Sequence, residues 1–369
     1  MNAPARQAFI DQLRGLTTLL VVLHHTAITY GGAGGWYYKE GAPAGSVAPL
    51  VLTLMTAVDQ AWFMGAFFLW AGYFTPGPFD RKGAPRYFAD RAIRLGIPLL
   101  VFGFFLDALT NAVADLGRGG DFLSGLVGRV ASLEYHPGPL WFVQALFVFA
   151  IGFACWRRFV PGPPRDDAPL PSHATLFRAA IGVALVAFAV RLAIPVGEEW
   201  WHWQLGYFPA YVLLFVVGCA AAPHRWLERI DRRYAKPWAI ASLVALPVLP
   251  AFALGYRAVM HARADVAGGF NVGSLVYAFW EPFVAWGILL ALMAFFRAKV
   301  RPERFARLGR RAYAIYCFHP PVVVGFSVLL HSWEAPALVK FFTVGGLSCA
   351  ALYLACGLLL RIPVVARVW

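Results

Sequence analysis

Charged residues are scarce in this sequence. Only 14% of the 369 residues are Asp, Glu, Lys or Arg, whereas 60% are apolar. A soluble domain usually carries about 25% charged residues, so this composition excludes a water-soluble globule of this length. The apolar residues also gather into blocks close to the roughly 20 residues that a helix needs to cross a bilayer. We therefore predict an integral membrane protein embedded in a lipid bilayer.

Cysteine is sparse as well, and its distribution excludes two kinds of site. The five cysteines all lie inside apolar blocks and show no spacing typical of a metal site. Neither disulfides nor zinc is indicated, and we expect no metal.

The net charge of +13 could suggest a nucleic-acid partner. Because Lys and Arg follow membrane topology here, we expect no nucleic-acid binding.

Ten apolar blocks follow one another along the chain, with short connections between them. We predict an all-α polytopic membrane protein, a bundle of about ten transmembrane helices. The blocks are residues 9–30, 48–74, 95–113, 138–156, 179–196, 205–222, 237–256, 272–296, 312–330 and 337–360.

The basic residues give an independent check on this topology, because Lys and Arg accumulate on the cytoplasmic side of a membrane. With the N-terminus placed inside, 25 of the 32 basic residues fall in cytoplasmic segments and 7 in the opposite segments. One missed or invented span would spoil this alternation. We therefore predict an even number of spans, with both termini cytoplasmic.

The first block carries charged and titratable residues, which are costly in the hydrocarbon region and mark a functional site by default. They are Asp11, Arg14, His24 and His25 in FIDQLRGLTTLLVVLHH. Arg14 and His25 are eleven residues apart, about three helical turns, so they share one face at a separation of roughly 16 Å. His24 is turned about 100° away. Arg14 as a topology anchor and His25 in a helix–helix hydrogen bond are the structural alternatives.

Arg91 and Arg94 stand at the start of the third block, in DRAIRLGIPLL. Residues three apart project from the same side of an α-helix. Guanidinium groups suit phosphate oxygens, which they bind through paired hydrogen bonds. The pair therefore indicates an anion site, with topology signalling as the alternative.

Further polar residues fall inside apolar blocks. Glu281 in FWEPFVAWG and His319 in AYAIYCFHPPVVV lie mid-block beside prolines, and Asp107 lies in the third block. Each could instead be structural, satisfied by an arginine or by a backbone carbonyl that proline frees. Trp141 and Gln144 in GPLWFVQALF could line a cavity, although tryptophan is common at membrane interfaces without a function.

With these segments in view, the sequence resembles the membrane acyltransferase 3 family over about residues 8–360. The resemblance is carried by FIDQLRGLTTLLVVLHHT, FFLWAGYFTP, RAIRLGIPLL, GPLWFVQALFVF and RRAYAIYCFHPPVVV. Ala71 departs from the pattern, because many relatives carry serine there. The resemblance implies one acyltransferase-type transmembrane domain, residues 1–369. The chain also departs from some relatives in stopping soon after the tenth block, so we expect a stand-alone member without their fused extracytoplasmic domain.

Membership of this family implies an enzyme of the cell inner membrane. It would transfer an acyl group, acetyl or succinyl, from cytoplasmic acyl-coenzyme A to a hydroxyl of a carbohydrate or glycolipid acceptor. Acyl-coenzyme A would be a co-substrate, with no permanently bound cofactor. The run YAFWEPFVAWGILL is most similar to members that succinylate periplasmic glucans.

The expected site follows from the resemblance and the spacing together. Arg14, Arg91 and Arg94 would hold the coenzyme A phosphates, and His25 would act as general base on the acceptor hydroxyl, because the pKa of histidine suits proton transfer near neutrality. Arg14 and Glu281 would complete the catalytic set. Residues expected to orient groups or bind substrate are Asp11, His24, Trp141, Gln144 and His319.

A proton-coupled transporter or flippase of a glycan or lipid-linked substrate is the alternative from another class. Buried titratable groups and proline-kinked helices suit it as well. Transporters often show two related halves, and the sequence shows no internal repeat. The acyl group, the acceptor and the oligomeric state stay open.

Overall fold

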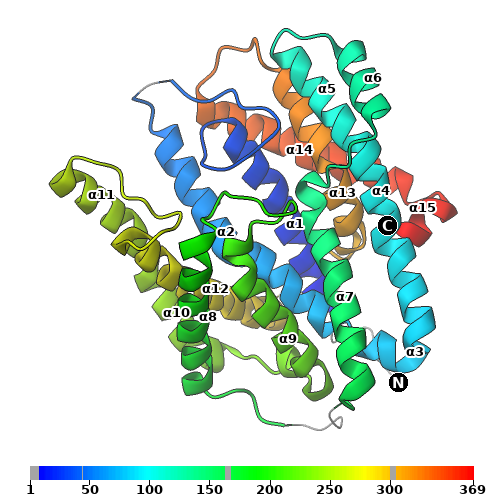
Figure 1. Cartoon of the computed structure of the whole chain (residues 1–369), viewed down its shortest axis with the longest axis vertical. Helices are drawn as coiled ribbons and strands as arrows, with labels where there is room; N and C mark the ends of the chain where they lie inside the picture. Colours follow the sequence, from blue (N-terminus) through cyan, green and yellow to red (C-terminus); the bar gives the residue numbers. More distant parts are fainter. Residues whose placement is uncertain (1–7, 44, 163–167, 300–304) are drawn as a thin grey trace. The chain divides into compact units, whose positions relative to one another are not determined.

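The computed structural model describes residues 8–43, 45–162, 168–299 and 305–369. Within these ranges the chain is helical and contains no strand, apart from one isolated bridge between Trp200 and Trp203. Figure 1 labels the helices along the chain. The prediction of an all-α protein is confirmed.

Nine helical segments of the described residues are long and apolar enough to cross a membrane. This confirms a multi-pass membrane protein. The first expected span, residues 9–30, is not among these nine; it corresponds to α1 (Ala8–Thr29), which has 22 residues but contains charged and histidine side chains. Its crossing and the cytoplasmic placement of both termini stay predictions. The nine segments are Ala48–Tyr73, Pro76–Gly117, Gly138–Phe159, His173–Ala193, Leu205–His224, Arg232–Met260, Val272–Lys299, Ala306–Leu329 and Ala337–Leu359.

The described chain divides into two compact units. Unit 1 holds residues 8–13, 60–83, 157–162 and 168–299, and unit 2 holds residues 14–43, 45–59, 84–156 and 305–369. Four helices contribute residues to both units: α1, α2 (Ala48–Tyr73), α3 (Pro76–Arg91) and α7 (Trp141–Phe159).

Unit 1 contains α8 (His173–Ala193), α9 (Phe208–His224), α10 (Arg232–Ala245), α11 (Val248–Met260) and α12 (Val272–Lys299). Small residues let its helices approach closely, as is usual in membrane bundles. A side chain at Gly72 of α2 would overlap the backbone of Phe215 in α9. In the same way, one at Gly287 of α12 would overlap Trp238 and Ser242 in α10.

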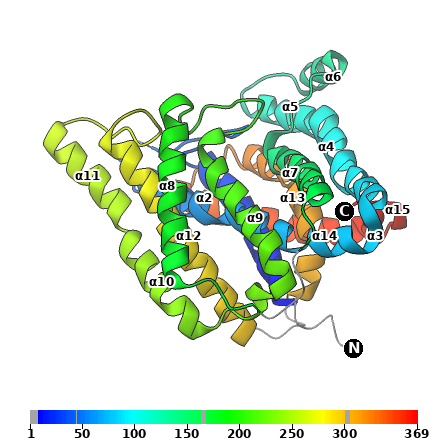
Figure 2. The ribbon, with the colours of Figure 1, turned by 60° about the horizontal axis from the view of Figure 1, so that its bottom comes forward.

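The seventh expected span, residues 237–256, is a broken helix. It consists of α10 and α11, which are interrupted at Leu246 and Pro247 and follow one another in Figure 2. Pro247 has no N–H to donate to the preceding helical turn. The break therefore has a local chemical cause.

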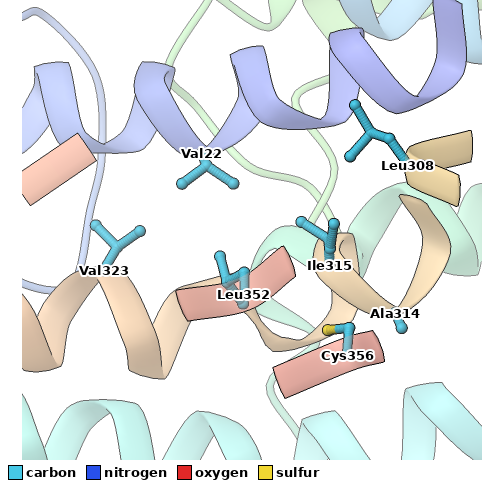
Figure 3. Packing of buried hydrophobic residues seen from close by; sticks show 7 residues of the cluster. All are labelled: Val22, Leu308, Ala314, Ile315, Val323, Leu352 and Cys356. Atoms are coloured by element: carbon cyan, nitrogen blue, oxygen red, sulfur yellow. The ribbon is translucent and has the colours of Figure 1, made fainter. Parts of the chain in front are cut away.

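Unit 2 contains α4 (Ile97–Val101), α5 (Asp107–Gly117), α6 (Phe122–Ser132), α13 (Ala306–Leu329), α14 (Ala337–Leu359) and α15 (Pro363–Val368), together with most of α7. Figure 3 shows an apolar cluster in which Val22 of α1 faces α13 and α14. The cluster includes Ile315 and Val323 of α13 and Leu352 of α14.

Helices α1 and α13 run side by side in the same direction. A side chain at Gly15 of α1 would meet Leu308 Cγ at 2.8 Å and the Gly309 amide nitrogen at 3.0 Å. Ten residues further along α1, the ring of His25 stacks with that of His319 in α13. Two contacts in the same sequence order make the helices parallel, as expected of two odd-numbered spans.

The third span differs from a regular helix. Two π-helical turns, Ala92–Gly96 and Phe102–Leu106, flank the short helix α4. Helices α6 and α15 were not expected, because 11 and 6 residues are too few to read as membrane spans. The carboxylate of Asp121 caps α6 by accepting a hydrogen bond from the Ser124 amide at 2.7 Å, which lowers the pKa of Asp121.

Candidate functional site

The ring of His25 stacks with two other aromatic rings of unit 2. The imidazole of His25 stacks on the indole of Trp36, with centroids 3.9 Å apart and an interplanar angle of 14°. It also stacks with the imidazole of His319, at 5.1 Å and 17°. The three rings are nearly parallel, since Trp36 and His319 differ by 11°. The structure therefore brings together two of the histidines singled out from the sequence.

The proline that follows His319 fixes its tautomer. In a regular helix the N–H of residue 320 would donate to the carbonyl of Tyr316, but Pro320 has no N–H. His319 Nδ1 takes this place, 2.6 Å from the Tyr316 carbonyl oxygen. Because a carbonyl only accepts, Nδ1 carries the proton and Nε2 is left with its lone pair.

The imidazole pair retains unused hydrogen-bonding capacity. His319 is fully buried, and its Nε2 has no hydrogen-bond partner among the described residues. The same holds for Nδ1 of His25. Buried polar atoms of this kind are rare and call for an explanation. A substrate hydroxyl or water at the edges of the rings would supply one.

His24 faces another neighbour, as its 100° turn predicts. Its Nδ1 lies 3.5 Å from Asp59 Oδ2 of α2, and both side chains are buried. Its ring meets that of His25 edge-on at 5.3 Å. His24 therefore packs beside the imidazole pair without joining the stack, and Asp59 is a residue that the sequence did not single out.

The predicted basic residues of unit 2 lie near the other end of this helix pair. Arg14 is half-buried in α1, and its carbonyl accepts a hydrogen bond from Thr18 at 2.8 Å. Arg91 is half-buried at the end of α3, with its guanidinium over the Tyr87 ring. Arg94 is exposed in the first π-helical turn.

Helix α13 contacts both the segment that carries Arg94 and the segment that carries Arg14. The hydroxyl of Tyr313 donates to the Arg94 carbonyl at 2.7 Å, and Leu308 of the same helix packs against Gly15, next to Arg14. Further along α13 lies His319, against His25. Because α1 is helical from Ala8 to Thr29, Arg14 and His25 lie roughly 16 Å apart along it.

Trp141 and Gln144 begin α7, also in unit 2. Both are half-buried, and Gln144 Oε1 is a buried acceptor without a hydrogen-bond partner in the described part of the chain. Tyr316, which holds His319, donates its hydroxyl to the Pro139 carbonyl just before α7. The start of α7 therefore lies beside the helical turn that carries His319.

A loop segment that the sequence reasoning missed covers His25. It comprises Trp36–Glu40, which we call the strap. The Tyr37 hydroxyl donates to Asp107 Oδ1 at 2.5 Å, and Arg118 donates to the Tyr37 carbonyl. Burial and the Asp107 carboxylate raise the pKa of Tyr37 well above its usual value, so the hydroxyl stays protonated.

The next strap residues are tied to the region around α13 and α14. The Tyr38 hydroxyl lies 2.7 Å from His331 Nδ1. Glu40 forms a salt bridge with the buried ammonium of Lys340. The sequence signal for this segment was the aromatic run WYYKE after a glycine-rich turn, which has neither helical nor strand periodicity.

Glu281 and Asp11 belong to unit 1. Glu281 forms a salt bridge with Arg191, whose side chain is fully buried. Arg191 also donates to the Gly206 carbonyl at 3.0 Å and lies under the ring of Tyr277. Asp11 is exposed on α1. The structural alternative for Glu281, an arginine partner, is thus present, and its catalytic role stays a prediction.

A small cavity of about 30 Å³ adjoins this salt bridge. Its lining includes Gln60, Tyr211 and Trp286 beside Arg191 and Glu281. That volume holds a water molecule or two but no sugar. Across the described ranges, no group of three or more His, Cys, Asp or Glu side chains is arranged to hold a metal ion.

The helices and the imidazole pair, in which His319 is fully buried and His25 half-buried, define a multi-pass membrane protein with a titratable site inside its bundle. A family model described as an acyltransferase domain matches residues 7–361. The chain therefore belongs to this family, acyltransferase 3, and is a membrane acyltransferase. That residues 1–369 form one such domain stays a prediction.

The chain is also similar to proteins from Salmonella. The chain is 25% identical over 355 residues to glucans biosynthesis protein C of Salmonella schwarzengrund (strain CVM19633), covering 92% of this chain and 88% of the relative. Identity and coverage are the same for the protein of that name from Salmonella typhi. The Salmonella agona (strain SL483) protein is 24% identical over the same shares. No solved structure matches the chain.

Proposed function

We propose that the protein transfers an acyl group from cytoplasmic acyl-coenzyme A to a hydroxyl of a glucan or related carbohydrate, in the bacterial inner membrane. The observation that carries this proposal is the imidazole pair of half-buried His25 and fully buried His319, on two parallel helices with arginines toward their other end. Membership of the acyltransferase family supports the reaction class. The glucan acceptor is suggested by the names of the Salmonella relatives.

The donor fits the arginines of unit 2. Coenzyme A carries several phosphate charges, which favour the aqueous rim over the hydrocarbon interior. Arg91 and Arg94 would bind these phosphates through charge-assisted hydrogen bonds, with Arg14 just inside them. The remaining distance of roughly 16 Å to His25 suits a thin pantetheine arm that delivers the thioester.

In the chemical step, His25 acts as general base. The acceptor hydroxyl oxygen forms a bond to the thioester carbonyl carbon, and the carbon–sulfur bond breaks. The hydroxyl proton passes to the imidazole and then to the leaving coenzyme A thiolate. General-base catalysis of this kind typically contributes about 10²–10⁴-fold in rate. His319, held by the Tyr316 carbonyl, orients the ring of His25.

The other predicted residues of unit 2 have supporting roles in this proposal. Trp141 and Gln144 lie at the start of α7, near Tyr316, and would bind the acceptor. His24, next to Asp59, would fix the position of α1 at this depth.

The experiment uses purified full-length protein in lipid vesicles, supplied with acetyl- or succinyl-coenzyme A and a linear or cyclic glucan. We expect coenzyme A to be released faster when the glucan is present, and mass spectrometry to find the matching ester on the glucan. Testing both thioesters identifies the acyl group. A protein that moves a glycan across the vesicle membrane without releasing coenzyme A would instead support the transporter alternative and contradict the proposal.

A further inference from the structure

The strap residue Trp36 contacts His25 but does not help to hold the strap in place. Its indole lies flat on the imidazole of His25 at 3.9 Å, whereas the rings of His319 and His24 lie at 5.1 Å and 5.3 Å from this histidine. Its Nε1 is buried without a hydrogen-bond partner among the described residues. The indole is therefore placed against the imidazole without a hydrogen bond that would account for its orientation.

Other contacts already hold the strap in place. Tyr37 is tied to α5 through Asp107, which also accepts a hydrogen bond from Asn111 at 3.1 Å. Glu40 is tied to α14 through Lys340, whose ammonium also donates to the His331 carbonyl at 3.1 Å. Because these anchors do not involve the indole, a smaller side chain at position 36 would uncover His25 without releasing the strap.

Access of water to the imidazole of His25 would have a chemical consequence. A general base that activates a hydroxyl beside a thioester also activates water. Hydrolysis would form a bond from the water oxygen to the acyl carbon and break the carbon–sulfur bond. Its proton would pass through the imidazole to the thiolate, giving a free carboxylic acid and coenzyme A. Closed active sites prevent such side reactions by excluding water.

We propose that Trp36 is a positioning residue that holds the imidazole plane of His25 parallel to that of His319 and closes one face of it to water. The acyl group is thereby directed to the acceptor hydroxyl instead of being lost by hydrolysis. This inference rests on the proposed function. It adds the residue that controls how much of the acyl group reaches the acceptor and how much is lost to water.

The test measures two products in one sample of full-length protein in vesicles with acyl-coenzyme A and glucan: total coenzyme A released and ester formed on the glucan. For Trp36→Ala we expect the fraction of released coenzyme A that appears as glucan ester to fall severalfold. Trp36→Phe retains a flat ring and should restore most of that fraction. Trp333→Ala, which removes a more exposed tryptophan from the loop after α13, should leave it at the wild-type value.

An anchor variant provides an independent check. Glu40→Gln weakens the salt bridge to Lys340 without touching the indole, and it should lower the ester fraction in the same direction but less. In the double variant with Trp36→Ala, the two effects should be less than additive, because both act through the cover on His25.

The outcomes separate the two proposals. If the wild type releases coenzyme A in response to glucan but Trp36→Ala slows release and ester formation equally, the residue is only structural and the inference is wrong. If the wild type forms no ester with either thioester, the proposed function itself is wrong.

Discussion

Replacing Glu281 by alanine leaves the guanidinium of Arg191 without its carboxylate partner in the interior of unit 1. The Arg191 side chain is fully buried, and that of Glu281 is 12% exposed. Removing one member of a buried ion pair typically costs about 3–5 kcal/mol of unfolding free energy. The cost arises because the remaining charge stays desolvated.

Contacts that survive the substitution place the expected loss at the lower end of this range. Arg191 keeps its hydrogen bond to the Gly206 carbonyl and lies 4.9 Å and 5.4 Å from the ring centroids of Tyr277 and Tyr207. Cation–π contacts of this kind are worth about 0.5–2 kcal/mol each. We therefore expect Glu281→Ala to lose about 3 kcal/mol, roughly a hundredfold in the unfolding equilibrium. Glu281→Gln keeps an acceptor and should lose about half as much.

The assay is reversible unfolding in mixed detergent micelles, followed for the wild type, Glu281→Ala, Arg191→Ala and the double variant. The double variant should be more stable than the sum of the single losses predicts, because no buried charge is left uncompensated. Wild-type stability in Glu281→Ala would show that the carboxylate does not stabilise the buried guanidinium. If acyl transfer were lost at the same time, Glu281 would have the catalytic role predicted from the sequence.

Two further predictions concern unit 2. Pro320→Ala restores an N–H that competes with His319 Nδ1 for the Tyr316 carbonyl. The maximal transfer rate should therefore fall severalfold at unchanged protein yield. An unchanged rate would contradict the fixed tautomer of His319. Arg91→Gln and Arg94→Gln should each raise KM for acyl-coenzyme A about tenfold, since one charge-assisted hydrogen bond is worth about 1.5 kcal/mol or more. Arg158→Gln, at another exposed arginine, serves as the control, and an equal rise there would point to a general charge effect.

Most of the membrane spans could be predicted because length and apolarity alone define them. The expected span 272–296 and the helix α12 (Val272–Lys299) differ by three residues at one end. The π-helical turns could not be predicted, because they depend on how a turn is packed as well as on its composition. The break at Pro247 has a local cause, but a proline in the sequence does not by itself show that a helix ends there, since α12 continues through Pro282. Helix α6 was missed because it is shorter than a span.

For the site, the helical period predicted the common face of Arg14 and His25 but could not place their neighbours. The partner of His25 on α13 comes from a residue nearly 300 positions away, and Trp36 comes from a loop without periodicity. Arg191 was not singled out from the sequence. Its burial against Glu281 depends on the packing of α8 and α12.

The imidazole of His25 is the base in the proposed acyl transfer. The most direct measurement is glucan-dependent coenzyme A release by His25→Ala in vesicles, beside His261→Ala, at an exposed histidine of unit 1, as the control. We predict a rate at least about 100-fold below wild type for His25→Ala and a wild-type rate for the control. A wild-type rate in correctly inserted His25→Ala would contradict the account.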